Sequence, residues 1–258
     1  MKLIDTHSHI YSDDFKDDIE EIISNCRKVN IGKILLPNID SESIPKMNRL
    51  VQRFPDMCVP MMGLHPTSVK ENYREELENC KAWLAKGSYC AIGEIGMDLY
   101  WDKAFVKEQQ IVFDTQINWA LERELPIVIH ARDSFDEIFE ILEAYRNSNL
   151  KGVFHSFTGN SEQAEKAIGL GFLLGINGIV TFKNSGLDKT IESLGLENLI
   201  LETDAPYLAP VPKRGKRNES SYLVHIASKL SEIYQLSLDE VAKTTSANAE
   251  KLFNIEFK

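Results

Sequence analysis

The stretch Leu3-Ile4-Asp5-Thr6-His7-Ser8-His9 (residues 3–9) sets a pattern that returns along the whole chain: a short apolar run ends in side chains that can bind a metal ion. Side chains alternate along a strand, so an extended backbone points His7 and His9 to the same side. Two imidazoles on one side can ligate one cation. The stretch therefore predicts a buried strand that ends in part of a metal site, although alone it also fits two histidines without a role.

Seven more apolar runs follow this first one at regular intervals. Runs rich in Ile, Val and Leu are typical of strands that are buried on both faces. The eight predicted strands cover residues 3–6, 33–37, 57–63, 90–93, 126–130, 152–155, 172–175 and 199–202. Apolar residues at three- and four-residue steps predict helices over 15–29, 43–54, 73–86, 103–123, 134–146, 161–170, 221–234 and 238–253. Ser161 and Ser237 are expected to cap two of these helices.

The alternation of eight strands with helices predicts an α/β fold, and eight such units in 258 residues fit a (β/α)8 TIM barrel. The seventh unit is the weakest, because residues 181–194 have room for only a short helix. The alternative is an open doubly wound sheet, whose first strand usually leads into a Gly-rich turn. No such turn follows residues 3–6, and no repeat or linker divides the chain. We therefore expect a single barrel domain over residues 1–258.

The composition is that of an ordinary globular protein, with 43% hydrophobic and 26% charged residues. No apolar run approaches the roughly 18 residues that a membrane helix needs, and the N-terminus has no apolar signal region. We therefore expect a cytoplasmic protein without a membrane span. The net charge of −10 weighs against a protein that coats nucleic acid nonspecifically, although two divalent ions would make one pocket locally positive.

The cysteine pattern gives no sign of cross-links. Cys26, Cys58, Cys80 and Cys90 form no CxxC pair, and none stands beside a histidine. This favours reduced thiols in a core over a disulfide framework or a zinc knuckle. A chain of this length can bury a large apolar core without disulfide bonds or a structural metal.

The histidines gather at one end of the predicted strands. Five of the six lie at or just past the carboxyl ends, where barrel enzymes build their active sites: His7, His9, His65, His130 and His155. His225 lies in a predicted helix and is assigned no role. Glu94 ends the fourth strand and Asp204 ends the eighth. A buried acid is costly unless it is paired or bound to metal, so each is a ligand, a strand-end cap or half of a buried ion pair.

Taken together, these donors favour metal binding. The predicted ligands are His7, His9, Glu94, His130, His155 and Asp204. A set of nitrogen and oxygen donors suits Zn, Mn, Co or Mg. Six donors exceed what one tetrahedral ion takes, so we expect two divalent metal ions, about 3.5–4 Å apart, that share a bridging carboxylate. Glu94 lies between the two groups of histidines around the barrel and is the expected bridge.

The chain resembles the TatD family of metal-dependent deoxyribonucleases over essentially its whole length. The resemblance rests on six ordered blocks and a seventh after them: DTHSHIY at 5–11, GLHP at 63–66, AIGEIGMDLYW at 91–101, PIVIHARDS at 126–134, FHSFTG at 154–159, LETDAPYLAP at 201–210, and RGKRNE at 214–219. It implies a (β/α)8 barrel of metal-dependent hydrolase type that cleaves phosphodiester bonds in DNA, as a 3′-5′ exonuclease-like enzyme with a two-metal activated water.

The same resemblance implies how the ligands divide. The first metal takes His7, His9 and Asp204, the second takes His130 and His155, and Glu94 bridges them. Two positions depart from the family pattern. Ser156 stands where Cys is frequent, and Ser220 stands where Pro is common. Neither is an expected ligand, so the departures touch pocket polarity and the path of a loop, not the metal chemistry.

Several residues beside the metal site are assigned to catalysis or to substrate binding. Glu94 and Asp204 are expected to be catalytic, and Asp204 either takes the proton of the attacking water as well or only ligates. His65 is expected to bind a phosphate oxygen or to protonate the leaving group, unless it only packs its loop. Arg132 suits a phosphate oxygen, unless it pairs with Asp133 or another carboxylate.

Residues 206–220 are expected to form a long loop at the mouth of the pocket. Its basic run would meet the phosphates of a substrate strand there, although such runs are usually just solvated: Lys213, Arg214, Lys216 and Arg217. Tyr207 and Trp101 are expected to stack a base or simply to pack. Two further acids have expected roles near the site. Glu202 is expected to orient a ligand, and Asp98 is expected to shape the fourth loop.

Two rival functions remain open at this point. A metal-dependent amidohydrolase or lactonase would use the same histidine and acid pattern, although such enzymes often bridge their metals with a modified lysine where this chain offers Glu94. The other rival is a barrel that keeps metal as a non-enzymatic scaffold. The leading hypothesis implies DNA as the partner, as single strands or ends, with no membrane and a monomeric protein.

Overall fold

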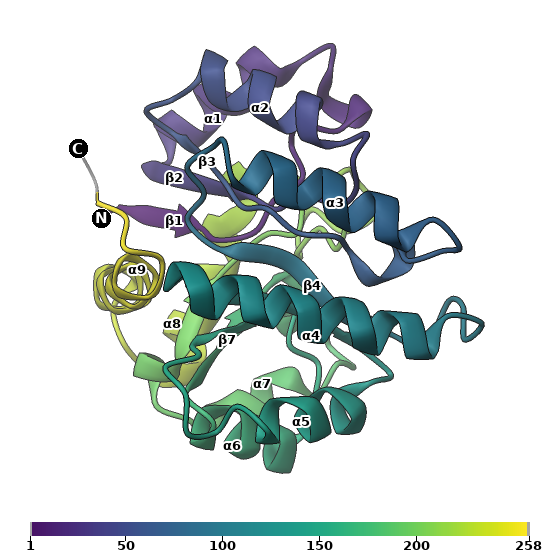
Figure 1. Ribbon diagram of the computed structural model, residues 1–258. Coiled ribbons are helices and arrows are strands. Elements are labelled where there is room, and N and C mark those ends of the chain that lie inside the picture. Colours follow the sequence, from purple (N-terminus) through teal and green to yellow (C-terminus); the bar gives the residue numbers. More distant parts are fainter. Residues whose placement is uncertain (1, 257–258) are drawn as a thin grey trace.

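Eight strands alternate with helices along the chain (Figure 1), and the computed structural model describes residues 2–256. The strands are β1 (Leu3–Asp5), β2 (Ile31–Leu36), β3 (Cys58–Pro60), β4 (Ile92–Asp98), β5 (Ile127–Arg132), β6 (Gly152–Phe154), β7 (Phe172–Ile176) and β8 (Leu199–Leu201). The domain predicted over residues 1–258 extends beyond the described part at residues 1, 257 and 258.

Most of the helices follow a strand. They are α1 (Ile19–Lys28), α2 (Ile44–Arg53), α3 (Tyr73–Leu84), α4 (Val106–Arg123), α5 (Phe135–Glu143), α6 (Ser161–Gly169), α7 (Leu187–Glu192), α8 (Leu223–Tyr234) and α9 (Leu238–Phe253). Short 3-10 helices lie at Asp13–Phe15, Pro66–Ser68, Gly178–Thr181, Leu196–Asn198 and Ser220–Tyr222. The short α7 confirms that the seventh unit has room for only a brief helix.

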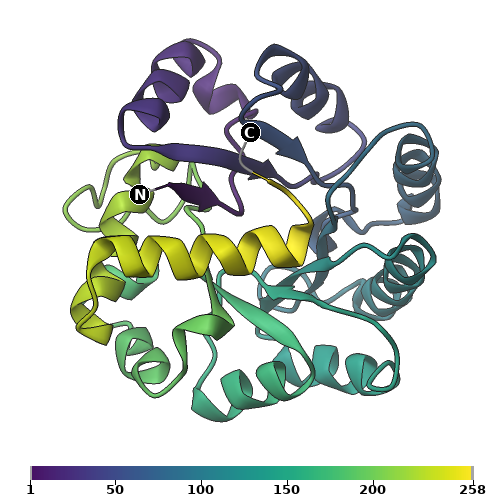
Figure 2. The ribbon, with the colours of Figure 1, turned by 90° about the vertical axis from the view of Figure 1, so that its left-hand side faces the viewer.

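All strands run parallel, in two sheets of order β1-β2-β3 and β4-β5-β6-β7-β8. Two seams join the sheets: Met62 pairs with Ile92 at one, and Ser8 pairs with Ala205 at the other. At the second seam, His9 N also donates to Ala205 O at 2.7 Å. The strands thus close into a (β/α)8 barrel with the helices around it (Figure 2), and the open doubly wound alternative is wrong.

The inside of the barrel is packed with apolar side chains. One cluster joins residues from most of the strands: Ile4, Leu35, Met61, Ala91, Val128, Val153 and Ile200. Ala249, Leu252 and Phe253 of α9 belong to the same cluster. Asn248 Nδ2 donates to Leu199 O at the start of β8, and α9 lies across the barrel in Figure 2. The last helix therefore closes the end at which the strands begin and leaves the carboxyl end open.

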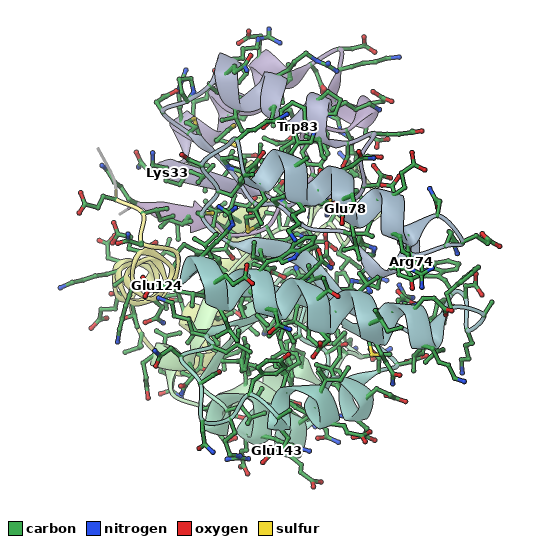
Figure 3. The ribbon with its side chains drawn as sticks, viewed as in Figure 1. Lys33, Arg74, Glu78, Trp83, Glu124 and Glu143 are labelled. Atoms are coloured by element: carbon green, nitrogen blue, oxygen red, sulfur yellow. The ribbon has the colours of Figure 1, made fainter. Side chains whose placement is uncertain are left out.

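The opposite faces of the strands pack against the surrounding helices. Ile34, Ile129 and Leu174 lie on these faces and are inaccessible to solvent, which is the two-sided burial that the continuous apolar runs predict. The outer surfaces of the helices carry polar side chains, such as Glu78 on α3 and Glu143 at the end of α5 (Figure 3). No helix within residues 2–256 is both long and apolar enough to cross a membrane.

The helix caps confirm one prediction and correct another. Ser237 caps α9 in a capping box with Glu240, as expected. The expectation for Ser161 is wrong, because Ser161 is already the first residue of α6. Asn160 is the cap instead, and its side chain accepts a hydrogen bond from Gln163 N at 2.9 Å. Asn and Ser are about equally good N-caps, so the sequence alone did not show which of these two neighbouring residues caps the helix.

All four cysteines are buried and free. Burial raises the pKa of the thiols of Cys58, Cys80 and Cys90 to about 12, and it raises the pKa of Cys26 as well. Thiols in this state behave as small apolar side chains of the core.

Candidate active site

The predicted ligands converge at the open end of the barrel. His9, Glu94, His130, His155 and Asp204 line one cavity of about 540 Å³. His7 lies directly beneath them and is fully buried, with its Nε2 3.2 Å from His9 Nε2. Residues separated by up to 197 positions in the sequence are thereby brought within a few ångströms of one another.

Strand alternation brings three of the rim side chains into the barrel. Each lies two positions after a residue that fills the lumen (Val128, Val153 or Ile200), and the three are His130, His155 and Glu202. Glu94 breaks this rule, because it lies three positions after the lumen residue Ala91. The pairing of β4 with β5 shifts register between Ile92 and Ile95, and this irregularity lets Glu94 face the site.

Glu94 occupies the centre of the cluster, and its two carboxylate oxygens face different histidines. Oε2 lies 3.1 Å from His7 Nε2 and 3.7 Å from His9 Nε2. Oε1 lies 2.7 Å from His130 Nδ1 and 3.7 Å from His155 Nε2. Burial raises the pKa of Glu94, but the surrounding imidazoles outweigh burial and hold that pKa well below its usual value. The carboxylate therefore faces two groups of imidazoles at once.

Asp204 approaches the cluster from the end of the eighth strand. Its Oδ1 lies 3.7 Å from His9 Nε2, 3.8 Å from His155 Nε2 and 3.9 Å from His7 Nε2. Burial, together with the charge of Glu94, raises the pKa of Asp204 to about 7. Its backbone adopts φ +57°, and Asp204 N donates to His7 O. This hydrogen bond joins the last predicted ligand to the first across the seam.

Three triads of potential ligand atoms fall within 4.8 Å of one another in the described residues. They are His7–His9–Glu94, His7–His155–Asp204 and His65–Glu94–His130. The first two contain only residues predicted as ligands. The third adds His65, which the sequence assigns to substrate or catalysis. Hydrogen bonds decide how to interpret it, because a ring nitrogen ligates a metal only through a free lone pair.

The hydroxyl of Tyr11 fixes the tautomer of His9. Tyr11 Oη donates to Pro37 O at 2.6 Å and lies 3.0 Å from His9 Nδ1. The hydroxyl has one proton and gives it to the carbonyl, so His9 Nδ1 must be the donor in the second bond. His9 Nε2 then carries the lone pair, and this is the nitrogen that faces Glu94 and Asp204. Burial lowers the pKa of His9 to about 4, so the ring is neutral and suited to a metal.

His65 has the opposite tautomer. Its Nδ1 accepts a hydrogen bond from Thr67 N at 3.1 Å, so in the neutral ring the proton resides on Nε2. Burial lowers the pKa of His65 and keeps it neutral. Its Nε2 lies 3.3 Å from Glu94 Oε1 and lines the cavity. His65 therefore offers an N–H group to the site instead of a lone pair.

His130 and His155 are each held by an acid behind them. His130 Nε2 lies 2.9 Å from Asp98 Oδ2, and His155 Nδ1 lies 2.8 Å from Glu202 Oε1. Burial lowers both pKa values, but the acids outweigh it and raise the pKa of His130 to about 9 and that of His155 to about 10. Acids behind histidines orient metal ligands in many proteins, and Glu202 occupies the place predicted for it.

The residues predicted to bind substrate lie around the mouth of the cavity. Arg132 is exposed, lines the cavity and stacks on Tyr100, with its guanidinium carbon 4.1 Å from the ring centroid. The same guanidinium also lies over the ring of Trp101, so the contacts described for the Arg132 side chain are with aromatic rings. Tyr207 lines the same cavity, and its ring centroid lies 6.4 Å from that of His9.

The side chains of the basic run in the 206–220 segment have separate partners. Arg217 pairs with Asp18 instead of facing the pocket, and Lys213 Nζ lies over the ring of Tyr222. Arg214 lines a cavity of about 620 Å³, where it covers the ring of Phe182. Asn218 fixes this segment with hydrogen bonds to two backbone carbonyls.

Sequence reasoning missed Tyr11 and Asp5. Asp5 accepts hydrogen bonds from Thr203 N at 2.8 Å and Thr203 Oγ1 at 2.6 Å and so holds β1 against the end of β8. Tyr11 stands two positions after His9, the spacing at which His9 follows His7, and that repeat is the signal that marks it. The two departures from the family pattern stay outside the triads: Ser156 bonds to Asn177, and Ser220 bonds to Ser8.

The residues present fit a divalent metal centre. The donors are nitrogen and oxygen atoms only, packed 2.7–3.9 Å from one another. The His7 and His155 rings stack with centroids 3.4 Å apart, and His7 Nδ1 is buried without a hydrogen-bond partner. Crowded lone pairs of this kind repel one another unless cations or protons separate them. The set suits Mg, Mn, Zn or Co.

Comparisons with known proteins agree with this geometry. The model of the family described as TatD related DNase matches residues 4–254. An uncharacterized metal-dependent hydrolase of Bacillus subtilis, YabD, is 34% identical over 98% of this chain and 99% of its own length. The 3′-5′ ssDNA/RNA exonuclease TatD of Pectobacterium carotovorum is 28% identical over 98% of this chain and all of its own.

Solved structures show the same architecture. The crystal structure of YjjV, a TatD homolog from Escherichia coli, superposes with a TM-score of 0.92 at 29% identity and covers 98% of both chains. A TatD family hydrolase from Entamoeba histolytica superposes with a TM-score of 0.83 at 21% identity and also covers 98% of both chains. The second likeness bears on the fold alone.

Proposed function

Because this chain belongs to the family of TatD related DNases, we propose that it is a metal-dependent hydrolase that cleaves phosphodiester bonds of DNA in the manner of a 3′-5′ exonuclease. Two relatives support the proposal, one described as a metal-dependent hydrolase and one as a 3′-5′ ssDNA/RNA exonuclease. The observation that carries it is Glu94, whose two oxygens face separate groups of imidazoles. Paired divalent ions that share such a carboxylate are a common device for phosphodiester hydrolysis.

Two divalent ions, Mg, Mn, Zn or Co, are the cofactors of this proposal. We assign the first to His7, His9 and Asp204, the second to His130 and His155, and both to Glu94. Ions bound there activate water and neutralise charge on the phosphate. The tautomer of His9 supports its assignment, because the lone pair of its Nε2 faces the cluster.

Three side chains have separate tasks around the reacting phosphate. Asp204 lies at the rim of the cavity, with its Oδ1 3.7 Å from His9 Nε2, where a carboxylate that holds an ion can also take up the proton of the attacking water. His65 donates its Nε2–H to a phosphate oxygen or to the leaving oxygen. Arg132 donates to another phosphate oxygen, where a charge-assisted hydrogen bond is strong.

Three cavities support a proposal for the path of the rest of the DNA strand. The cavity with Glu94, a second of about 720 Å³ and the one with Arg214 all share Leu208 in their walls. We propose that a DNA strand follows this line, with one phosphate near Arg132, a further phosphate near Arg214, and Tyr207 against a sugar or base. Cytoplasmic location and a monomeric state stay predictions from the sequence.

The test is incubation of the protein, loaded with each of the four ions in turn, with end-labelled single- and double-stranded oligonucleotides. We expect a ladder of products that shortens from the 3′ end. Hydrolysis should stop in EDTA and resume when the ion is added again. Glu94→Gln should lower the rate on the order of a thousandfold, and Glu78→Gln on the outer face of α3 should leave it unchanged. Hydrolysis of amides or lactones, with intact oligonucleotides, would instead support the amidohydrolase alternative.

A further inference from the structure

Three large aromatic side chains stand open to solvent around the site. The exposed fractions are 54% for Tyr100, 68% for Trp101 and 58% for Tyr207. Burial or stacking of an aromatic ring lowers the free energy of the system. Exposed rings grouped beside a cavity therefore indicate a surface that binds a ligand. Trp101 and Tyr207 both line the cavity that holds Glu94.

The loop that carries Tyr100 and Trp101 is tied to the centre by one carboxylate. Asp98 Oδ1 accepts hydrogen bonds from Tyr100 N at 3.0 Å and Trp101 N at 3.1 Å. The other oxygen of the same side chain lies 2.9 Å from His130 Nε2. Asp98 therefore fixes the backbone of the two aromatic residues relative to His130, a predicted metal ligand. The same hydrogen bonds hold the loop in the position in which both rings are exposed.

Arg132 adds a planar cation to the two rings. Its guanidinium carbon lies 4.1 Å from the centroid of Tyr100 and 5.5 Å from that of Trp101. The two rings meet edge to face, with centroids 5.0 Å apart. A guanidinium stacked on aromatic rings keeps its N–H groups free for phosphate oxygens. One surface thus offers flat faces for a base and donors for the phosphate attached to it.

We infer that Tyr100, Trp101 and Arg132 form a platform on which an unpaired nucleobase stacks beside the phosphate that is cleaved. The inference rests on the proposed function and names the residues that position its substrate. A base reaches such a platform only when it is out of the duplex stack, which agrees with the single strands and ends expected as substrates. Stacking of this kind tolerates every base, because each has a flat face.

The first experiment compares two single-stranded substrates in the metal-loaded protein. One is an ordinary oligonucleotide, and the other carries abasic tetrahydrofuran residues on both sides of the terminal phosphodiester. We expect the wild-type protein to favour the ordinary strand in KM by about tenfold, the effect of losing one stacked base. Trp101→Ala should remove most of this preference, and Trp101→Phe should retain it.

Trp83→Ala is the matched control, because Trp83 is 43% exposed on the outside of α3 (Figure 3). It should keep the wild-type preference. Equal KM values for the two strands in the wild-type protein would overturn the platform, and so would a preference that survives in Trp101→Ala. In either case cleavage itself would still support the proposed function.

The second experiment does not require turnover. Trp101 is the most exposed of the three tryptophans, since Trp83 is less exposed and Trp119 is buried. A phosphorothioate oligothymidine, which resists hydrolysis, should quench the tryptophan fluorescence of the wild-type and Trp83→Phe proteins and leave Trp101→Phe nearly unquenched. Quenching without hydrolysis of any phosphodiester would keep the platform and reject the proposed function. Quenching that persists in Trp101→Phe would reject the platform.

Discussion

His9 and His65 lie on the same cavity and present different nitrogens to it. Tyr11 makes Nδ1 of His9 the donor, and Thr67 makes Nδ1 of His65 the acceptor. A neutral imidazole has one proton, so the partner on one nitrogen decides what the other can do. His9 is left with a lone pair for a metal, and His65 with a proton for an oxygen atom.

Removing the hydroxyl of Tyr11 tests this division. In Tyr11→Phe, His9 Nδ1 loses its acceptor and the ring is free to take the other tautomer. Loss of such a partner behind a ligand typically lowers metal affinity about 10- to 100-fold, and we expect a decrease of that size in a calorimetric titration with Zn²⁺ or Mn²⁺. Tyr234→Phe is the control, because Tyr234 Oη also donates to a backbone carbonyl, that of Ile191. Unchanged affinity in Tyr11→Phe would contradict the tautomer assignment.

The buried thiols lead to a prediction about pH. Cys58, Cys80 and Cys90 have pKa values of about 12 in the folded chain, above the roughly 8.5 of an unfolded thiol. The thiolate is the reactive form, so the native protein should react slowly with Ellman's reagent at pH 8, and all four thiols should react rapidly in guanidinium.

The same shift fixes the sign of the effect on stability. The unfolded chain loses these protons first as the pH rises, so stability that is fully present below about pH 8.5 is lost between about pH 9 and 12. Urea titrations at pH 8 and pH 10 measure this loss of folding stability. Rapid labelling of the folded protein at pH 8 would show that the thiols are not sealed in the core.

At the scale of the element, α6 separates two adjacent residues that look alike in sequence. Asn160 caps the helix, and Ser161 is its first residue. Asn160→Ala should lower the free energy of unfolding by about 1 kcal/mol, because the bond from Gln163 N is lost. Ser161→Ala should change it by less than about 0.5 kcal/mol. Urea denaturation of the two variants decides the matter, and equal losses would mean that both residues cap the helix.

The strands show which parts of an element a sequence can predict. Continuous apolar runs locate all eight, because most positions of a strand buried on both faces are apolar. The bounds differ where backbone pairing departs from the apolar run: β3 is only Cys58–Pro60, and β4 extends to Asp98. Alternation correctly brings His130 and His155 inward from Val128 and Val153. It does not predict Glu94, whose orientation depends on a register shift in the sheet.

At the scale of the whole molecule, the cluster spans both sheets of the barrel. His7 and His9 follow β1, Glu94 and His130 belong to β4 and β5, and Asp204 follows β8. The gathering of these residues could be predicted, since barrels collect the carboxyl ends of their strands. The separate places of Arg214 and Arg217 could not, because they depend on the path of a loop that Asn218 fixes by hydrogen bonds across the chain.

A centre that connects both sheets should stabilise the folded protein when cations bind to it. Any ion that binds only the native state adds about 2.7 kcal/mol at one hundred times its Kd, which corresponds to a rise of about 5–10 °C in Tm for a chain of this size. Scanning calorimetry with and without Mn²⁺ or Zn²⁺ measures the rise. Glu94→Gln should reduce it, and Glu78→Gln should not. A Tm that none of the four ions moves would argue against a metal centre.

The seam between Ser8 and Ala205 has a consequence for folding during synthesis on the ribosome. The first strand finds β2 early, but its other edge stays bare until almost two hundred further residues have been made. An unpaired strand edge is a template for pairing with foreign chains, and contacts so distant in sequence form slowly. We therefore expect the nascent chain to be most prone to pairing with other chains before residues 199–205 have been made.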